Sequence, residues 1–412
     1  MRIVFIAHFA GSLKHGMVFG HYYLAREWVR MGHEVTIVAA AYAHTRSSQP
    51  EGISGTFTEE RIDGIRYLWV RTPRYAPGSA IGRVLNILAF AMQVRLRRIP
   101  VDAADLVICS SHHPLAIYGA QQLVRRLRTR LVFEVRDLWP LTLIELGGAS
   151  RANPLIVAMQ WAEDRAYRSA DAVVSVLEHS RDYMVSRGMA PEKFHYVPNG
   201  CDDQPERLGE LPDAHRRALG RLQGRFLVGY AGRVGLANAL DAVIEALAQC
   251  RVSDAVVVVL GDGSHARALR ARANELGVGD RLLVLPPVRK DQVAAFLERV
   301  DVTYVGLLPE PLFRFGVSPT KLNDYLLAAK PVICAIDARI DAVDESGAVI
   351  QCPPSEPARI ARAIEQLYAA GPGGRAEMGA RGFEWVSRRR KYSYLAREFL
   401  RAAGIGDRGA GQ

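Results

Sequence analysis

The chain has 412 residues, of which 49% are hydrophobic and 23% charged, a composition typical of a globular protein large enough for two domains. The mean hydropathy is +0.00 and no uncharged apolar run reaches 18 residues, which argues against a membrane-spanning helix. The net charge of +10 indicates an anionic partner. Because zinc-finger spacing and basic stripes with interleaved aromatic residues are both lacking, nucleic acid is the least favoured partner.

The opening segment MRIVFIAHFAG (1–11) has too short an apolar stretch for a signal peptide and is typical of a first strand. The five cysteines are scattered and include no CxxC pair. They predict reduced, mostly buried thiols in a cytoplasmic protein, and no zinc site.

In the first half of the chain, short apolar runs alternate with longer helical stretches. Strands are predicted at Arg2–Ala7, Glu34–Ala39, Leu106–Ser110, Leu131–Val135 and Ala172–Val176, and helices at Tyr22–Met31, Leu115–Arg128 and Ile156–Ser169. The strands are apolar throughout instead of alternating, as expected when helices cover both faces of a parallel sheet. Residues 56–70 are predicted to form an antiparallel excursion.

The pattern restarts after a polar, arginine-rich stretch at 202–224. New strands are predicted at Phe226–Ala231, Ala255–Leu260, Leu282–Leu285, Val302–Val305 and Val332–Ala335, and helices at Ala239–Ala248, Ser264–Leu276, Asp291–Val300, Thr320–Ala329 and Tyr392–Ala403. The sequence therefore predicts an α/β protein with two doubly wound domains in tandem. We expect the carboxyl ends of their strands, where ligands bind in such sheets, to face an interdomain cleft.

The segment FGVSPTKLNDYLLAAKP (315–331) is the most informative for chemistry. Ser318 is expected as an N-cap and Pro319 as the first helical residue, so the helix would aim free amides and its positive dipole end at an anion. Lys321 would add a full charge, and Asp324 lies three residues further along the same face. The alternative is a well-capped buried helix with a weak Lys–Asp surface pair.

Five motifs occur in an order that resembles the retaining glycosyltransferases of GT-B architecture (family 4 type). They are VFEVRDLWP (132–140), YVPNGCD (196–202), GYAGRVGLANALDAVIEAL (229–247), LGDGS (260–264) and SPTKLNDYLLAAKPVI (318–333). The branch that the chain resembles contains O-antigen and capsule transferases that handle acetamido sugars such as N-acetylfucosamine.

The resemblance implies an N-terminal acceptor-binding domain (1–203), a C-terminal nucleotide-sugar-binding domain (204–386), a helical segment crossing back to the first domain (387–405) and a disordered tail (406–412). It also implies that Lys321 and Arg233 clamp the donor diphosphate and that Asp324 holds the ribose hydroxyls. The loop 286–288, with Pro287 and Val288, would read the base. Gly232, Ser318, Pro319 and Thr320 would lie beside the phosphates.

Two departures from the family pattern affect the donor site. Many members have two glutamates eight residues apart, but here Asp324 is preceded at that spacing by Gly316, with Glu310 and Arg314 nearby. The lysine that commonly follows the GR turn is replaced by Ala239. The identity of the donor sugar is therefore open, and more of the phosphate binding is expected to fall to Lys321 and Arg314.

Other residues at predicted strand ends are candidates for the acceptor side. Asp137 could orient the acceptor hydroxyl or stabilise the transition state, or it could pair with Arg136 or cap a turn. His112 and His113 could contact the acceptor, or they could be structural. Gly16, in the glycine-containing loop before the first helix, could let the backbone approach the donor. Glu134 and Glu145 are interpreted as structural or surface groups.

No Asp-x-Asp pair that would hold a diphosphate through Mg²⁺ is evident, so metal-independent catalysis on a UDP-sugar is expected, without a cofactor. The leading hypothesis is transfer to a lipid-linked or lipopolysaccharide glycan. The alternatives are a UDP-sugar 2-epimerase of the same architecture and a non-catalytic protein that binds membrane surfaces.

The segment 81–98, IGRVLNILAFAMQVRLRR, is predicted to be an apolar helix with a basic end. It could be an ordinary core helix with a solvated end, which is the favoured interpretation. It could instead rest on an anionic leaflet, which would place the protein peripherally at the inner face of the plasma membrane.

Overall fold

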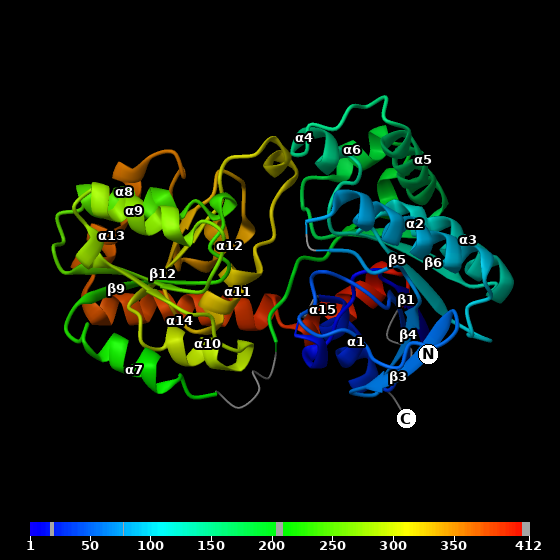
Figure 1. Ribbon diagram of the computed structural model, residues 1–412, viewed down its shortest axis with the longest axis horizontal. Coiled ribbons are helices and arrows are strands. Elements are labelled where there is room, and N and C mark those ends of the chain that lie inside the picture. Colours follow the sequence, from blue (N-terminus) through cyan, green and yellow to red (C-terminus); the bar gives the residue numbers. More distant parts are fainter. Residues whose placement is uncertain (17–19, 77, 203–208, 406–412) are drawn as a thin grey trace. The chain divides into compact units, whose positions relative to one another are not determined.

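The computed structural model describes residues 1–16, 20–76, 78–202 and 209–405, and the chain divides into two compact units (Figure 1). Unit 1 comprises Met1–Asn199 and Tyr392–Gln412, and unit 2 comprises Gly200–Lys391. The tail expected at 406–412 and the boundary expected at 203/204 lie outside the described residues or at their edge.

Unit 1 is built on an eight-stranded sheet in the order β3-β4-β2-β1-β5-β6-β7-β8. The strands are β1 (Arg2–Ile6), β2 (Glu34–Ala40), β3 (Phe57–Ile62), β4 (Ile65–Val70), β5 (Leu106–Ser110), β6 (Arg130–Val135), β7 (Ala172–Ser175) and β8 (Phe194–Tyr196). All neighbours are parallel except β3 and β4, so the predicted antiparallel excursion is confirmed for β3, whereas β4 pairs in parallel with β2. The winding reverses between β1 and β5, and ligands bind beside the carboxyl ends of strands at such a point.

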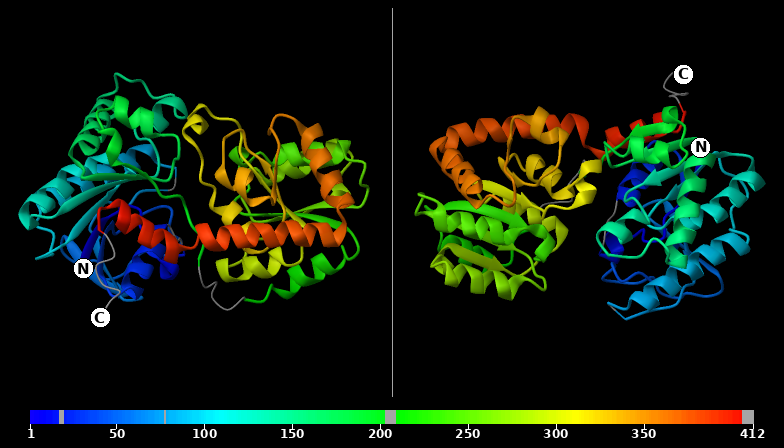
Figure 2. Two further views of the ribbon diagram at one scale, coloured as in Figure 1. Left: turned by 180° about the vertical axis from the view of Figure 1, so that it is seen from behind. Right: turned by 90° about the horizontal axis from the view of Figure 1, so that it is seen from above.

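Helices cover both faces of this sheet. They are α1 (Gly20–Arg30), α2 (Ala80–Leu96), α3 (Ile117–Leu127), α4 (Leu141–Glu145), α5 (Pro154–Ser169), α6 (Arg181–Ser186) and α15 (Tyr392–Ala402). The helices α1 and α15 pack together on one face, where the Trp28 indole donates a hydrogen bond to the Ala396 carbonyl at 3.0 Å. The helices α2, α3 and α5 lie side by side on the other face (Figure 2).

Unit 2 has a six-stranded, fully parallel sheet in the order β11-β10-β9-β12-β13-β14. The strands are β9 (Phe226–Ala231), β10 (Ala255–Leu260), β11 (Leu282–Leu285), β12 (Val302–Gly306), β13 (Val332–Ala335) and β14 (Val349–Gln351). In chain order this is the 3-2-1-4-5-6 arrangement of doubly wound folds, with its reversal between β9 and β12. The predicted pair of doubly wound domains is thus confirmed.

The two faces of the unit 2 sheet bury separate cores because side chains alternate along each strand. Phe226, Val228 and Tyr230 face a core that includes residues of α8, α9 and α13, whereas Leu227 and Ala231 face the core of α10, α11 and α14. The helices of this unit are α7 (Asp213–Gly220), α8 (Leu240–Gln249), α9 (Ala266–Glu275), α10 (Lys290–Leu297), α11 (Thr320–Leu327), α12 (Asp341–Ser346), α13 (Pro357–Ala369) and α14 (Gly371–Arg389). The polar stretch 202–224 therefore contains a helix, α7.

Candidate active site

Two glycine turns lie against each other at the carboxyl edge of the unit 2 sheet. A Cβ atom on Gly261 would lie 1.9 Å from the Gly232 carbonyl oxygen, and one on Gly263 would lie 2.1 Å from that of Val234. Backbone can approach this closely only where no side chain intervenes. The motifs GYAGRVG and LGDGS therefore form one packed turn structure beside the ends of β9 and β10.

Lys321, in the first turn of α11, points into this structure. Its ammonium group donates to the Tyr230 hydroxyl at 2.8 Å and to the Asn238 side-chain oxygen at 3.0 Å, and it lies 4.6 Å from the centre of the Tyr230 ring. Gly232 has a φ of +147°, and a Cβ there would lie 2.4 Å from the Lys321 Cε atom. The glycine is therefore needed to admit the lysine.

Lys321 has only neutral partners among the described residues. Since an ammonium group has three N–H donors, two are used and one remains for a ligand. Burial lowers the pKa of Lys321 to about 8, because desolvation disfavours its charged form. A partly buried cation without a counter-charge is suited to receiving an anion.

The start of α11 differs by one residue from the prediction. Pro319, with φ −74° and ψ 111°, is the N-cap, and the helix begins at Thr320, so Ser318 lies before the cap. Pro319 takes this position because its carbonyl accepts the first hydrogen bond of the helix, from the Leu322 amide at 3.1 Å. A proline side chain cannot cap, so the amides of Thr320 and Lys321 receive no hydrogen bond from the side chain of their N-cap residue.

Arg233 and Asp324 occupy the surface near this turn. The Arg233 side chain is exposed, while its carbonyl accepts hydrogen bonds from Tyr230 and Asn238 at 2.7 and 3.1 Å. The carboxylate of Asp324 pairs with Lys290, the first residue of α10, and not with Lys321. The predicted Lys321–Asp324 surface pair is therefore wrong, because the two side chains have different partners.

The remaining donor-side candidates have local contacts. Pro287 is exposed and Val288 is partly buried against the core beneath α10. The carbonyl of the preceding Pro286 bonds to the His215 ring at 2.9 Å. Arg314 donates to the Pro311 carbonyl of its own turn, and its guanidinium lies 4.3 Å from the centre of the Phe315 ring.

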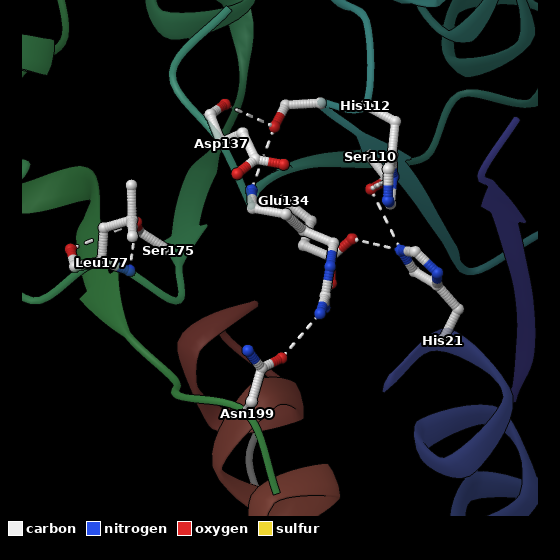
Figure 3. A network of polar contacts seen from close by, with 10 residues as sticks. His21, Ser110, His112, Glu134, Asp137, Ser175, Leu177 and Asn199 are labelled. Carbon is white, nitrogen blue, oxygen red and sulfur yellow. Dashed lines mark hydrogen bonds and ion pairs between the residues drawn. The ribbon is translucent and has the colours of Figure 1, made fainter. Parts of the chain in front are cut away.

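A polar network occupies the carboxyl edge of the unit 1 sheet, centred on Glu134 (Figure 3). This carboxylate, 2% exposed, accepts hydrogen bonds from His21 at 2.9 Å and from Arg136 at 3.3 Å. Arg136 also donates to the Asn199 side chain at 2.6 Å, and His21 lies 3.1 Å from the Ser110 hydroxyl. Glu134 therefore joins α1, β5, β6 and the end of unit 1.

Burial alone would raise the pKa of Glu134, but the pull of His21, assisted by Arg136, brings it below the usual range. Burial lowers the pKa of His21, opposed by Glu134. The consistent arrangement is an ionised glutamate that accepts hydrogen bonds from His21 and Arg136. Glu134 is thus internally paired, in contrast to its interpretation as a possible surface group.

Asp137 is the next residue after Arg136 in the chain and lies at the surface. Its side chain is exposed, and its carbonyl accepts a hydrogen bond from the Ser111 hydroxyl at 3.1 Å, which in turn accepts from the Arg136 amide at 3.0 Å. The atoms crowded around Asp137 raise the pKa of its carboxyl by desolvation, and Arg136 opposes this. The turn is held by Ser111, so the Asp137 carboxylate is not needed to hold it.

The two adjacent histidines have different environments. His112 is partly buried and lies 3.3 Å from the Ser110 hydroxyl. His113 is 1% exposed and packs edge-on against His8 and Phe90, and neither of its ring nitrogens has a hydrogen-bond partner. Burial lowers the pKa of His113 to about 3. His113 thus lies beneath the surface, which argues against direct contact with an acceptor.

Gly16 has a structural reason to be glycine. It ends a short 3₁₀ turn with φ +73°, and a Cβ there would lie 1.7 Å from the Ser47 hydroxyl. Its expected approach to the donor involves residues 17–19, which lie outside the described residues. In the described part of the chain, no group of three His, Cys, Asp or Glu side chains is arranged to hold a metal ion. All five cysteines are buried thiols that form no disulfide.

Comparison with known proteins assigns the chain to a family. Residues 16–200 match the family described as "Glycosyl transferase 4-like domain", and residues 225–370 match "Glycosyl transferases group 1". The chain belongs to the family 4 glycosyltransferases. The predicted family is thus confirmed, and this glycosyltransferase has the GT-B fold.

Several relatives support the assignment over most of its length. WbjE of Pseudomonas aeruginosa, named as a probable glycosyltransferase, is 21% identical over 290 residues, 70% of this chain and 71% of that protein. WcaI of Escherichia coli K12, named as a glycosyl transferase of colanic acid biosynthesis, is 23% identical over 324 residues, 76% and 78% of the two chains. The structure of Anabaena HepE in complex with UDP-glucose superposes with a TM-score of 0.65 at 17% identity, covering 98% of this chain and 99% of that one.

The glycosyltransferase has site residues that sequence reasoning missed. Tyr230 and Asn238 hold Lys321, Lys290 pairs with Asp324, and His21 pairs with Glu134. Only Glu134 carried a signal in the sequence, because a charged residue inside an apolar strand must have a buried partner.

Proposed function

We propose that this retaining glycosyltransferase moves an acetamido sugar from a UDP-sugar to a lipid-linked or lipopolysaccharide glycan. The observation that carries the proposal is Lys321, a partly buried cation held by neutral partners at the first turn of α11. Charge that develops on a leaving diphosphate would be stabilised there by an ammonium group already in place.

On the donor side, Lys321 and Arg233 would bind the diphosphate together with backbone amides at the start of α11. Gly232 would keep the backbone open beside it, and Ser318, Pro319 and Thr320 would border the same anion. Arg314 is the further cation proposed for this task. No enzymic nucleophile and no metal ion are part of the proposal.

The nucleoside would lie beside the β11–α10 loop. Asp324 would accept hydrogen bonds from the ribose hydroxyls in place of its pair with Lys290, an exchange that costs little because the Lys290 side chain is 57% exposed. The backbone at Pro287 and Val288 would read the base. The choice of UDP is supported by the fold shared with HepE, whose structure contains UDP-glucose.

On the acceptor side, Asp137 would orient the reacting hydroxyl and His112 would line its approach. The exposure of Asp137 and the hydrogen-bonded turn behind it favour this role. Gly16 is proposed to approach the donor through its backbone. The polysaccharide acceptor is supported by similarity to WcaI, which is named for colanic acid biosynthesis, and the acetamido sugar by the order of the five sequence motifs.

The first experiment is a thermal-shift series with UDP, GDP, and their sugars, because a ligand that binds only the folded state raises the melting temperature. We expect UDP and a UDP-acetamido sugar to raise it most. Transfer is then measured with radiolabelled donor and a lipid-linked glycan fraction, and the anomeric configuration of the product by NMR. Stabilisation by GDP alone, or an inverted product, would contradict the proposal.

The alternative of a UDP-sugar 2-epimerase predicts conversion of the donor without any acceptor. Incubating the protein with UDP-N-acetylglucosamine alone separates the two activities. The family match favours transfer, so we expect the donor sugar to remain unchanged over the time in which transfer is complete.

We also propose that the protein acts peripherally at the inner face of the plasma membrane, where a lipid-linked acceptor would lie. Among the described residues, no helix is both long and apolar enough to cross a bilayer.

A further inference from the structure

The helix α2 has two apolar faces, and only one is covered. Its buried residues are Asn86, Ile87, Phe90 and Val94. Its exposed large side chains are Ile81, Leu85, Leu88, Met92 and Leu96, at 76%, 54%, 38%, 57% and 68% exposure. At 100° per residue, these five lie within an arc of roughly 80° directly opposite the buried face. We call this set the α2 stripe.

The α2 stripe is unusual for this molecule. Twelve large hydrophobic side chains are exposed among the described residues, and five of them lie on this one helix. Scattered exposed apolar residues need no explanation, but a continuous row along 17 residues indicates a surface that is covered in use. The favoured interpretation of this segment as a core helix with a solvated end is therefore wrong for its outer face.

The sequence that contains the α2 stripe carries only positive charge. From Gly64 to Val101 the sequence has no aspartate or glutamate and seven arginines. At the C-terminal end of α2, Arg95, Arg125 and Arg165 line a hollow of about 300 Å³. The other lining residues are Tyr118, Gln121 and Gln122, so no carboxylate enters the hollow.

Two of the three guanidinium groups of this hollow have a neutral hydrogen-bond partner. Arg95 donates to the Gln122 side chain at 2.6 Å, and Arg165 donates to that of Gln121 at 2.6 Å. None of the three has an ion-pair partner in the described part of the chain. Three cations that converge without a counter-charge suit a phosphate group.

We propose that the α2 stripe and this arginine hollow together dock unit 1 on an anionic phospholipid leaflet. The stripe would enter the boundary between headgroups and acyl chains, and the hollow would take a lipid phosphate. A second copy of this chain fits less well, because a two-fold contact through α2 would bring one arginine-rich flank against the other.

The position of α2 connects this surface to the acceptor side of unit 1. Asn86, on the buried face of α2, bonds to the His8 ring at 2.7 Å, directly after β1. The docked helix would thus hold the carboxyl edge of the sheet close to the leaflet from which a lipid-linked acceptor comes. The link to a lipid-linked acceptor rests on the proposed function, whereas binding to vesicles can be tested without it.

The test is flotation with vesicles of phosphatidylglycerol or of phosphatidylcholine, using the full chain. We expect the protein to float with phosphatidylglycerol and much less with phosphatidylcholine. The double substitution Leu85→Gln and Met92→Gln should weaken binding at least tenfold, because it removes apolar area from the membrane-facing side. The matched control, Tyr368→Gln and Phe383→Gln, removes exposed apolar side chains from unit 2 and should not weaken it.

A second pair of variants tests the hollow. Substituting Arg95→Gln and Arg125→Gln should weaken binding by about fivefold per arginine and reduce its salt dependence. The control Arg267→Gln and Arg270→Gln removes the same charge from the exposed face of α9 and should have a smaller effect. If both pairs of substitutions weakened vesicle binding equally, the hollow would not be a specific phosphate site.

Two further outcomes would overturn the proposal. One is absence of flotation with phosphatidylglycerol. The other is a dimer in light scattering that the Leu85→Gln, Met92→Gln variant converts to a monomer, which would identify a second copy as the occupant. The UDP-induced thermal shift separates this test from the proposed function, since α2 variants should keep that shift and Lys321→Ala should keep vesicle binding.

Discussion

The carboxyl edges of the two sheets pair their charged groups in different ways. In unit 1, Glu134 has Arg136 and His21 as built-in partners within hydrogen-bond distance. In unit 2, the partners of Lys321 among the described residues are a phenol and an amide oxygen. A charge with its counter-charge supplied by the fold contributes to structure, whereas a charge without one is available to a ligand.

The same folding pattern therefore serves different purposes at the two edges. Substitutions at the unit 1 network should change stability and leave nucleotide binding intact. Substitutions at the unit 2 lysine should change nucleotide binding and leave stability nearly intact.

The largest effect is expected for Glu134→Ala. Removing this carboxylate leaves a buried Arg136 without its counter-charge, which costs about 3–5 kcal/mol in comparable sites. The melting temperature should fall strongly, while the thermal shift caused by UDP should persist. The control Glu59→Ala breaks an exposed pair with Arg66 in the same unit and should cost less than about 1 kcal/mol. Loss of the UDP shift at an unchanged melting temperature would reverse the assignment of the two edges.

For Lys321→Ala we expect turnover to fall by about 10²-fold or more, because the ammonium would stabilise charge that develops on the diphosphate. UDP should also lose most of its stabilising effect. Lys330→Ala is the matched control, since this lysine lies just beyond the other end of α11 and its ammonium group donates to the Glu298 carbonyl. Unchanged turnover in the Lys321→Ala variant would contradict the proposal that Lys321 stabilises charge on the diphosphate.

Much of this contrast could be predicted from the sequence. The predicted strands Leu106–Ser110, Phe226–Ala231 and Ala255–Leu260 match β5, β9 and β10 residue for residue, because continuous apolar runs have sharp ends. Lys321 was found because it follows a Ser-Pro helix start. Its partners Tyr230 and Asn238 are 91 and 83 residues away in the sequence, so only the fold brings them together.

The helix α14 was missed for a related reason. Its sequence contains several glycines, which disfavour helices in isolation. In the structure, a Cβ on Gly379 would lie 1.9 Å from the Ala329 carbonyl oxygen, and one on Gly382 would lie 2.8 Å from Leu326. The glycines allow α14 to pack closely against α11, so tertiary packing outweighs local propensity. The exposure of the α2 stripe was equally hidden, because apolar periodicity does not reveal whether a face is covered.

A pH effect of intermediate size should distinguish the two edges. Burial lowers the pKa of Lys321 to about 8, and a bound diphosphate would raise it again by stabilising the charged form. Protonated Lys321 therefore binds UDP better, and affinity should fall about tenfold from pH 7 to pH 9. Isothermal titration calorimetry measures this directly. Lys321→Arg should flatten the profile, since arginine stays charged throughout; a flat wild-type profile would contradict the lowered pKa.

The smallest effect concerns Glu163 of α5, a buried carboxyl in unit 1 that lacks the cationic partners of Glu134. It accepts hydrogen bonds from Tyr167, Tyr183 and Gln160 at 2.9, 2.9 and 2.7 Å. Burial raises the pKa of Glu163 to about 7, opposed by these hydrogen bonds. The folded state thus holds a proton that the unfolded state has released, so the free energy of unfolding should fall as pH rises.

Between pH 6 and pH 8, this single group should reduce the free energy of unfolding of unit 1 by about 1 kcal/mol. Glu163→Gln should remove that part of the pH dependence, as measured by thermal melts at each pH, and should stabilise the protein mainly above pH 7. An unchanged pH dependence would mean that the three hydrogen bonds already hold Glu163 ionised below pH 6. Hydrogen bonds from neutral groups would then be enough to keep a buried carboxylate ionised. In that case, stabilising the charge of Glu134 would not by itself explain the presence of Arg136 and His21 beside it.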